Sequence, residues 1–334
     1  MKKTIINLIL IICLPSYANE FTYEKISAYD FNDTIKVMCW SPNETYLACA
    51  TDEFTITVIN TKDNSRKVLE GHENLIKALV FSPDGKFLIS GSDDITIEVW
   101  DTQNWESIFT INAHENSIEC LAFSSDSTLC ASGSRDGTIK IWNTNDWKCI
   151  KTLNHKGYVS NVSFSKNGSS LISYSNNNKT VKTWNLNDFN YLGVINYNDS
   201  DNILVSEDMT KILNTYKAKT TISDYLRKNE QLLKLKQTIS FVSFSTDASK
   251  LRYTIDNQIF IRNISSSKKS KPIIETNETI EAISWSNKEN RVAIKLDGKV
   301  EIWVATQNPT LIKPSAQSGI KSNPDTDEKE WELI

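Results

Sequence analysis

A segment of about 41 residues recurs along this chain. The stretch FSPDGKFLISGSDDITIEVWD (81–101) is followed by FSSDSTLCASGSRDGTIKIWN (123–143) and by FSKNGSSLISYSNNNKTVKTWN (164–185). Self-similarity at a fixed period means that each repeat is one structural unit that cannot bury its apolar surface alone. The period therefore constrains the fold more than any other feature of the sequence.

Each unit is marked by an aromatic or apolar residue just before a turn that begins with Ser. Successive markers are separated by 41, 42, 41, 41, 39 and 41 residues. The seven markers are Trp40, Phe81, Phe123, Phe164, Val205, Phe244 and Trp285. The fifth unit is predicted mainly from its spacing, because its turn sequence departs from the others.

The units have the pattern of short β-strands. Apolar residues alternate at Ile118, Leu121 and Phe123, and again at Ile139 and Ile141, while Gly, Asn, Asp and Ser interrupt the runs. No segment keeps a helical period over three turns. A unit of this length has room for four strands and four turns.

Two residue pairs give the repeat a recognisable signature. In the second unit, Gly71-His72 precedes the marker and Trp100-Asp101 closes the third predicted strand. Together with the period, this signature resembles the WD40 family, over about residues 20–307. The resemblance implies an all-β fold, a seven-bladed β-propeller of four-stranded antiparallel blades.

The first predicted strand has no unit of its own in front of it. The segment at about Glu24–Tyr29 has the same offset from Trp40 as Ser107–Asn112 has from Phe123. We expect it to supply the outer strand of the last blade, which otherwise ends at Ile302-Trp303. Closure of this kind removes exposed sheet edges.

The N-terminus has the order of a secretory signal peptide. Lys2-Lys3 precede an apolar run, Ile5–Leu14, and Ser16-Tyr17-Ala18 places small residues at positions −3 and −1. We predict cleavage after Ala18 and a periplasmic or secreted protein. A lipoprotein attached at Cys13 is the alternative, which bulky residues before that cysteine disfavour. The apolar run is too short for a membrane span.

This division gives three segments: a signal peptide at 1–18, the propeller at 19–308 and a flexible C-terminal tail at 309–334, where Pro, Ser and Asn replace the repeat. The net charge of −4 argues against nucleic acid or an anionic membrane as the partner. We expect no integral membrane span, and either a monomer or a subunit of a hetero-complex.

Five cysteines follow the predicted cleavage site: Cys39, Cys49, Cys120, Cys130 and Cys149. They lie within strand patterns and without the paired spacing of a zinc site, so buried apolar roles are expected. A disulfide between Cys120 and Cys130, on neighbouring strands of one hairpin, stays open. The sequence predicts neither a metal site nor a cofactor.

All three histidines, His72, His114 and His155, stand nine residues before a marker. The WD40 resemblance implies a buried hydrogen-bond network of His, Ser, Asp and Trp at these places. Two sets are complete and are predicted as structural tetrads: His72, Ser90, Asp94 and Trp100, and then His114, Ser132, Asp136 and Trp142. In the fourth unit His155, Ser173 and Trp184 remain, but asparagines 176–178 replace the Asp.

The trio Ser132, His114 and Asp136 also has the composition of a hydrolytic triad. The same trio recurs in consecutive units, and a Trp takes the remaining hydrogen bond, so the structural role is favoured. We predict no catalytic residue and no enzyme activity.

The remaining candidate is the propeller's top face, where the loops enter the innermost strands. In WD40 proteins partner contacts often fall six and four residues before the marker. By that rule the predicted partner-binding residues are Lys36, Leu75, Lys77, Glu119, Tyr158, Asp199, Asp201 and Glu281. Two lysines on neighbouring units and acids around much of the remaining rim predict a polarised surface for a protein or peptide.

The sequence therefore favours an exported, non-catalytic interaction platform. Two alternatives stay open: a propeller hydrolase that uses carboxylates in the central channel, and a secreted effector-type protein that binds a target on another cell.

Overall fold

The repeat seen in the sequence folds as β-sheet throughout. The protein is described here from a computed structural model, which describes residues 21–307 except 176, 197–201, 207–210, 217–218, 225–229, 234–238, 246 and 266–269. The predicted signal peptide and the predicted tail lie outside the described residues. Two compact units are distinguished: Tyr23–Ala305, and Met1–Thr22 with Thr306–Ile334. In the second of these units, the hydroxyls of Thr22 and Thr306 lie 2.8 Å apart.

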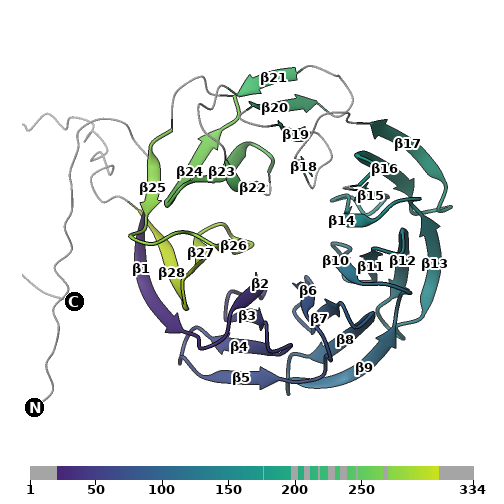
Figure 1. The fold of residues 1–334 in the computed structure, drawn as a ribbon, viewed down its shortest axis with the longest axis horizontal. Coiled ribbons are helices and arrows are strands. Elements are labelled where there is room, and N and C mark those ends of the chain that lie inside the picture. Colours follow the sequence, from purple (N-terminus) through teal and green to yellow (C-terminus); the bar gives the residue numbers. More distant parts are fainter. Residues whose placement is uncertain are drawn as a thin grey trace, which may run out of the picture. The chain divides into compact units, whose positions relative to one another are not determined.

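Within the described residues, the strands pair into seven four-stranded sheets, arranged as blades around a centre (Figure 1). The first four sheets are β2 (Ile35–Trp40), β3 (Tyr46–Thr51), β4 (Ile56–Asn60) and β5 (Arg66–Leu69); β6 (Ile76–Phe81), β7 (Phe87–Ser92), β8 (Thr96–Asp101) and β9 (Glu106–Asn112); β10 (Ile118–Phe123), β11 (Leu129–Ser134), β12 (Thr138–Asn143) and β13 (Cys149–Asn154); β14 (Val159–Phe164), β15 (Ser170–Ser175), β16 (Thr180–Asn185) and β17 (Tyr191–Asn196).

The other three sheets follow the same plan. They are β18 (Asn202–Val205), β19 (Lys211–Tyr216), β20 (Lys219–Asp224) and β21 (Glu230–Leu233); β22 (Ser240–Phe244), β23 (Lys250–Ile255), β24 (Gln258–Asn263) and β25 (Pro272–Glu275); β26 (Ala282–Trp285), β27 (Arg291–Leu296), β28 (Lys299–Gln307) and β1 (Phe21–Asp30). The propeller of four-stranded antiparallel blades is thus confirmed. In the sheet β18–β21 most side chains lie outside the description, so the other six sheets carry the packing argument.

The Ser after each marker explains why this position repeats. In every sheet its hydroxyl accepts a hydrogen bond from the backbone N–H five residues later, and its own N–H donates to the carbonyl of that residue. A buried hydroxyl of this kind satisfies the tight turn from the first strand to the second. The seven residues are Ser41, Ser82, Ser124, Ser165, Ser206, Ser245 and Ser286.

The last sheet is completed by the first strand of the chain, as predicted. β1 lies beside β28, and the Lys25 Nζ donates a hydrogen bond of 3.1 Å to the Glu301 carboxylate. Tyr29 is buried with Val300 and Ile302 of β28, in a cluster that reaches Trp40 of the first sheet. The closing segment is longer than expected, since it spans residues 21–30 rather than 24–29.

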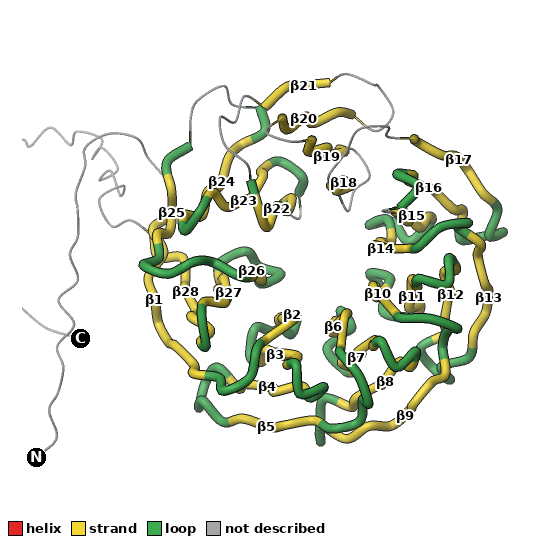
Figure 2. The backbone as a smooth tube through the Cα atoms, in the orientation of Figure 1, coloured by secondary structure: helices red, strands yellow, loops and turns green. Residues whose placement is uncertain are grey.

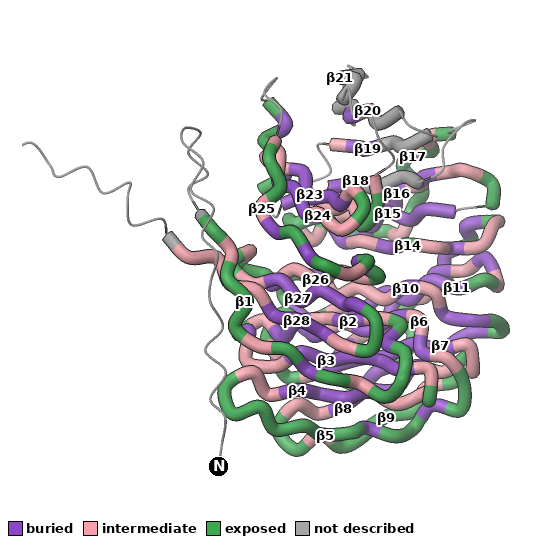
Figure 3. The backbone as a smooth tube through the Cα atoms, turned by 60° about the vertical axis from the view of Figure 1, so that its left-hand side comes forward, coloured by how far each residue is buried: buried purple, intermediate pink, exposed green. Residues whose placement is uncertain are grey.

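Within a blade, the second strand is the more buried and the outer, fourth strand is the more exposed. The second strands, such as β7 and β11, are buried at five of their six positions, because neighbouring blades cover both faces. The outer strand β9 is exposed at six of seven positions (Figure 3). The strict inside–outside alternation expected of a half-buried strand therefore fails in the second strands.

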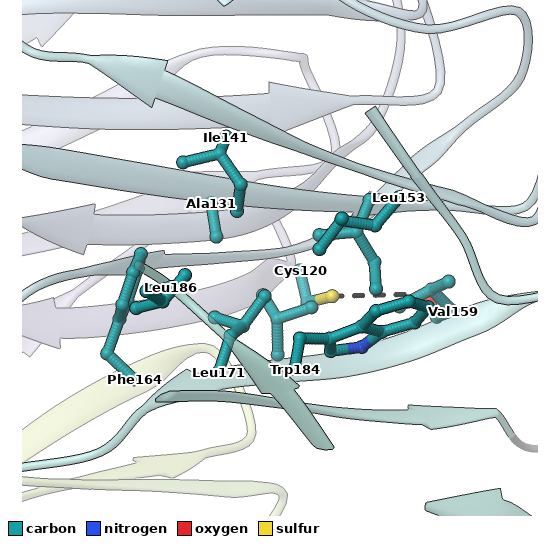
Figure 4. Close-up of a cluster of buried hydrophobic side chains, with 11 residues drawn as sticks. Cys120, Ala131, Ile141, Leu153, Val159, Phe164, Leu171, Trp184 and Leu186 are labelled. Atoms are coloured by element: carbon teal, nitrogen blue, oxygen red, sulfur yellow. Dashed lines mark hydrogen bonds between the residues drawn. The ribbon is translucent and has the colours of Figure 1, made fainter. Parts of the chain in front are cut away.

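The core lies between blades rather than inside one sheet. Figure 4 shows the cluster between the third and fourth sheets, in which Cys120 and Ile141 pack against Val159 and Trp184. Comparable clusters occupy the interfaces between the other successive sheets. Each blade is therefore stabilised by its neighbours, as expected of a repeat architecture.

The two cysteines for which a disulfide stayed open are both free thiols. Cys120 stands opposite Gly133 and Cys130 opposite Phe123, so their side chains lie on opposite faces of one sheet. Cys120 packs toward the fourth sheet and Cys130 toward the second. Burial raises the pKa of both thiols. Their roles are those of small apolar core residues.

Across the described ranges, the backbone contains strands and loops (Figure 2), and no helix there is long and apolar enough to cross a membrane.

Candidate functional site

The second sheet contains the first of the expected four-residue networks. The Trp100 Nε1 donates to the Ser90 Oγ at 3.0 Å, and that hydroxyl lies 2.8 Å from the His72 Nε2. The His72 Nδ1 lies 2.7 Å from the Asp94 carboxylate. Because an ionised carboxylate only accepts hydrogen bonds, donation has one direction along the network: Trp donates to Ser, Ser to His, and His to Asp.

The third sheet repeats this geometry with its own four residues. Trp142 donates to Ser132 at 2.9 Å, Ser132 lies 2.7 Å from His114, and His114 lies 2.9 Å from Asp136. Both networks bind the third strand, the second strand and the loop from the preceding blade together. Their serines are fully buried and both histidine side chains are covered.

The electrostatics agree with this arrangement. Burial alone would raise the pKa of Asp94, but hydrogen bonds from His72 and Thr96 outweigh it and hold the pKa below its usual range. The pKa of Asp136 is lowered in the same way, against burial, chiefly by hydrogen bonds from Thr138. Burial lowers the pKa of His114, and the neighbouring Asp136 offsets part of that effect. Both acids are therefore carboxylates at neutral pH.

This geometry leaves little room for hydrolytic chemistry at Ser132. Its Oγ already accepts from Trp142 and donates to His114, and the residue has no exposed surface. A nucleophile must reach its substrate. The trio therefore has the composition of a hydrolytic triad, but its serine is not accessible to a substrate.

The fourth sheet keeps only one link of the network. Trp184 donates to Ser173 at 2.9 Å, whereas His155 is fully buried and, within the part of the chain that the structure describes, neither ring nitrogen has a side-chain hydrogen-bond partner. Burial, together with the Lys182 ammonium, lowers the pKa of His155 to about 4. The expected loss of the Asp is thus accompanied by loss of the histidine's bonds.

At the top face, the four predicted charged residues that the structure describes each have a partner of opposite sign within their own sheet. Lys36 lies 3.8 Å from Asp52, and Lys77 lies 3.2 Å from Asp93. Each pair joins the start of the first strand to the turn after the second strand. The lysines are held in place without being buried, since 40% and 31% of their side chains are exposed.

The sign of these pairs reverses in the third sheet. There Glu119 is on the first strand and pairs with Arg135 at 2.5 Å; in the last sheet Glu281 pairs with Lys295 at 2.5 Å. The Ser117 hydroxyl contacts both Asp93 and Glu119, and so links the second sheet to the third.

An aromatic residue extends this row into the fourth sheet. The Arg135 guanidinium lies 5.6 Å from the centre of the Tyr158 ring, a cation–π distance. Leu75 is half-buried at the matching place in the second sheet, and its carbonyl accepts from the Asp93 N–H. Asp199 and Asp201 lie outside the described residues. The structure therefore brings the second, third and fourth sheets together in one continuous polar row.

The repeat spacing did not predict the partners of these charged residues: Asp52, Asp93, Arg135 and Lys295. The first three directly follow the second strand, after Thr51, Ser92 and Ser134, so a signal was present in the repeat. Reading the position after each second strand together with the fourth residue before each marker would have paired them.

At the opposite end of the ring, a cavity of about 460 Å³ opens between the turns after β2 and β6, lined by Pro42, Tyr46, Phe81 and Pro83 among others. Among the residues that the structure describes, no group of three or more His, Cys, Asp or Glu side chains could hold a metal ion.

Comparison with protein families agrees with the repeat geometry. Residues 63–101, 105–143 and 147–185 match the model of the WD domain, G-beta repeat, known as WD40. Each match begins near the outer strand of one sheet and ends at the third strand of the next. No curated protein matches the chain.

Proposed function

We propose that the protein is an exported, non-catalytic platform, and that it binds a protein or peptide on the top face of a seven-bladed ring. The chain contains three WD40 repeats within a β-propeller, a fold that commonly serves as a scaffold for protein interactions. Fold alone does not assign function, so the proposal depends on the site.

The observation that carries the proposal is the row of charged pairs that changes sign between the second and third sheets. Lys36 and Lys77 present cations at the inner positions of two neighbouring sheets, and Glu119 presents an anion at the next one. A partner with acidic and basic groups in matching order would be fixed in register there. Complementary charge of this kind favours specificity and rapid association.

Tyr158 and Leu75 supply the apolar component of the same surface. Aromatic anchors surrounded by polar groups are typical of transient interfaces. The residues implicated in binding are thus Lys36, Leu75, Lys77, Glu119 and Tyr158, with Glu281 across the ring.

The test reverses two charges. A partner is first captured with the wild-type protein from the compartment in which it resides. We then expect Lys36→Glu with Lys77→Glu to weaken binding by roughly 1–3 kcal/mol, through lost pairing and new repulsion. Titration calorimetry at low and high salt measures this, and salt should weaken the wild-type complex more than the variant complex.

The matched control makes the same change in net charge, two lysines to two glutamates, at the opposite end of the same two sheets. Lys62 lies in the turn between β4 and β5, and Lys86 in the turn between β6 and β7. We expect Lys62→Glu with Lys86→Glu to leave the affinity unchanged. If both double variants bind like the wild type, or if both weaken alike, the top face of these sheets is not the binding site.

A further inference from the structure

Three histidines occupy equivalent places in three consecutive sheets, and one of them differs. His72 and His114 each contact a Ser and a carboxylate. The His155 side chain is buried to the same extent, but neither of its ring nitrogens has a side-chain hydrogen-bond partner among the described residues. Burying a polar group without a partner is unfavourable, and a buried charge without a partner is much more so.

The cause is a change in the turn between the second and third strands. The Thr180 hydroxyl donates to the Asn178 Oδ1 at 2.7 Å, just as the Thr96 hydroxyl donates to Asp94 at 2.7 Å. Asn178 therefore stands where the other two sheets have the Asp. Its Nδ2 donates instead to the Lys156 carbonyl at 3.3 Å.

The charges around His155 are positive. The Lys182 Nζ, from β16, donates to the His155 carbonyl at 2.5 Å and disfavours a second positive charge on the ring. Lys156 lies close enough to Lys182 to lower the pKa of its ammonium, after the larger effect of burial. No carboxylate among the residues that the structure describes acts on this imidazole.

The loop that carries His155 is closely packed. Gly157 leaves no room for a Cβ against Asn178 and Ser175, and Lys156 has a positive φ of 63°. The His155 N–H donates to the carbonyl of Gly137 in the third sheet at 2.9 Å. Tyr158 follows directly, under the Arg135 guanidinium. The loop cannot admit water to the imidazole without moving these contacts.

We propose that the fourth sheet is an acid-sensitive element, in which protonation of the unpartnered His155 opens the loop 154–158 and the sheet β14–β17 beside it. The third sheet should respond less, because Asp136 is placed to pair with the His114 imidazolium and offsets part of the effect of burial on its pKa.

The direction of the effect follows from proton linkage. In the closed loop the pKa of His155 is held at about 4, by burial first and then by Lys182. In the opened loop water reaches the ring, and the pKa returns toward the ordinary value of about 6.5. Between these values the open form binds more protons, so the opening equilibrium rises as pH falls. For one proton, this amounts to about a twentyfold increase from pH 7 to pH 5.

If the top face binds a partner, acid would also displace Tyr158 from that surface and weaken the complex. This consequence rests on the proposed function, whereas the opening itself does not.

The experiment is hydrogen exchange on the full chain without a partner, at pH 7 and pH 5, corrected for intrinsic exchange rates. We expect opening to increase about twentyfold in peptides that cover Asn154–Phe164 and Ser170–Asn185, in line with the linkage. Their counterparts in the third sheet, Ala113–Phe123 and Thr128–Asn143, should show a smaller increase, because Asp136 offsets part of the effect of burial on the pKa of His114.

Two variants make the assignment specific. His155→Leu removes the titrating group and no hydrogen bond, so the acid response should disappear while the fold persists. Asn178→Asp restores a carboxylate beside the ring, so the response should shrink toward that of the third sheet. His114→Leu is the matched control, and it should destabilise the protein because it leaves Asp136 and Ser132 without their partner.

An unchanged acid response in His155→Leu or Asn178→Asp would overturn the proposal, as would equal opening of the third and fourth sheets. If a variant fails to fold, NMR titration of the His155 ring in the wild type decides. A pKa well below 6 supports the proposal, and a value at or above the ordinary one refutes it. None of these outcomes depends on a partner, so failure here leaves the proposed binding surface untested and intact.

Discussion

In each complete network of this propeller, a single serine hydroxyl connects the tryptophan to the histidine. Ser90 and Ser132 each accept from a Trp and donate to a His, so one buried atom joins two strands to an incoming loop. Networks of this kind are stable when every member is satisfied and unfavourable when one is missing. The acid at the end of each chain therefore determines whether the other three residues are satisfied.

We expect Asp136→Ala to lower the free energy of unfolding by roughly 2–4 kcal/mol, because it leaves His114, Thr138 and two backbone amides without an acceptor. Denaturant unfolding measures the change. Lys62→Ala, at an exposed turn position, is the control and should stay within about 0.5 kcal/mol. Equal midpoints for the two variants would contradict the structural role of the network.

At the scale of single residues, the sequence predicts the hydrogen-bond networks built from the recurring motif, but it does not predict the ion pairs between neighbouring strands. His, Ser, Asp and Trp recur at fixed offsets, so the resemblance to WD40 repeats could assign both complete networks. The partner of Lys77 is Asp93, sixteen residues away, and their pairing can be predicted only when the antiparallel register is combined with the repeat. The sequence placed the missing Asp only within asparagines 176–178, because one extra residue in this turn shifts Asn178 from the expected offset.

At the scale of strands and turns, the position of a strand within its blade determines how closely its sequence follows the repeat pattern. The first and second strands of each sheet, with the Ser turn between them, follow the pattern well, because the turn and its buried hydroxyl are the same in every sheet. The outer strands such as β9 and β13 are exposed along most of their length and vary in sequence. Their pairing was predicted from offset alone.

Deletion of Phe21–Tyr29 should lower the melting temperature sharply, because it uncovers the edge of β28 and removes Tyr29 and the Lys25–Glu301 pair. Thermal unfolding followed by circular dichroism measures the effect. Deletion of Pro314–Ile334, which removes none of the described strands, is the control and should leave the melting temperature nearly unchanged. Similar melting of the two deletions would mean that β1 does not hold the ring closed.

At the scale of the whole molecule, the core is distributed between neighbouring sheets, with one apolar cluster at each described interface. No sheet can bury its apolar faces alone, so the spacing of the markers predicted the architecture even where individual motifs were weak. The fifth unit was inferred from spacing, and its backbone forms β18–β21. The identity of a partner could not be predicted in this way, because the same scaffold supports many loop chemistries.

We expect N-terminal sequencing of the exported protein to begin at Asn19, as cleavage after Ala18 predicts. This site lies just before Phe21, where β1 begins, so processing would leave the closing strand whole. A protein that retains Met1, or that begins at a lipid-modified Cys13, would contradict the prediction.

The pairing of β1 with β28 sets the order in which this protein can be finished. Among the described strands, β1 is synthesised first and β28 last. The Lys25–Glu301 contact joins residues 276 positions apart. Contacts so distant along the chain form slowly and after local ones. β1 must therefore stay without its partner strand until β28 has been made, so the pairing that completes the last sheet can form only after the other described strands have been synthesised.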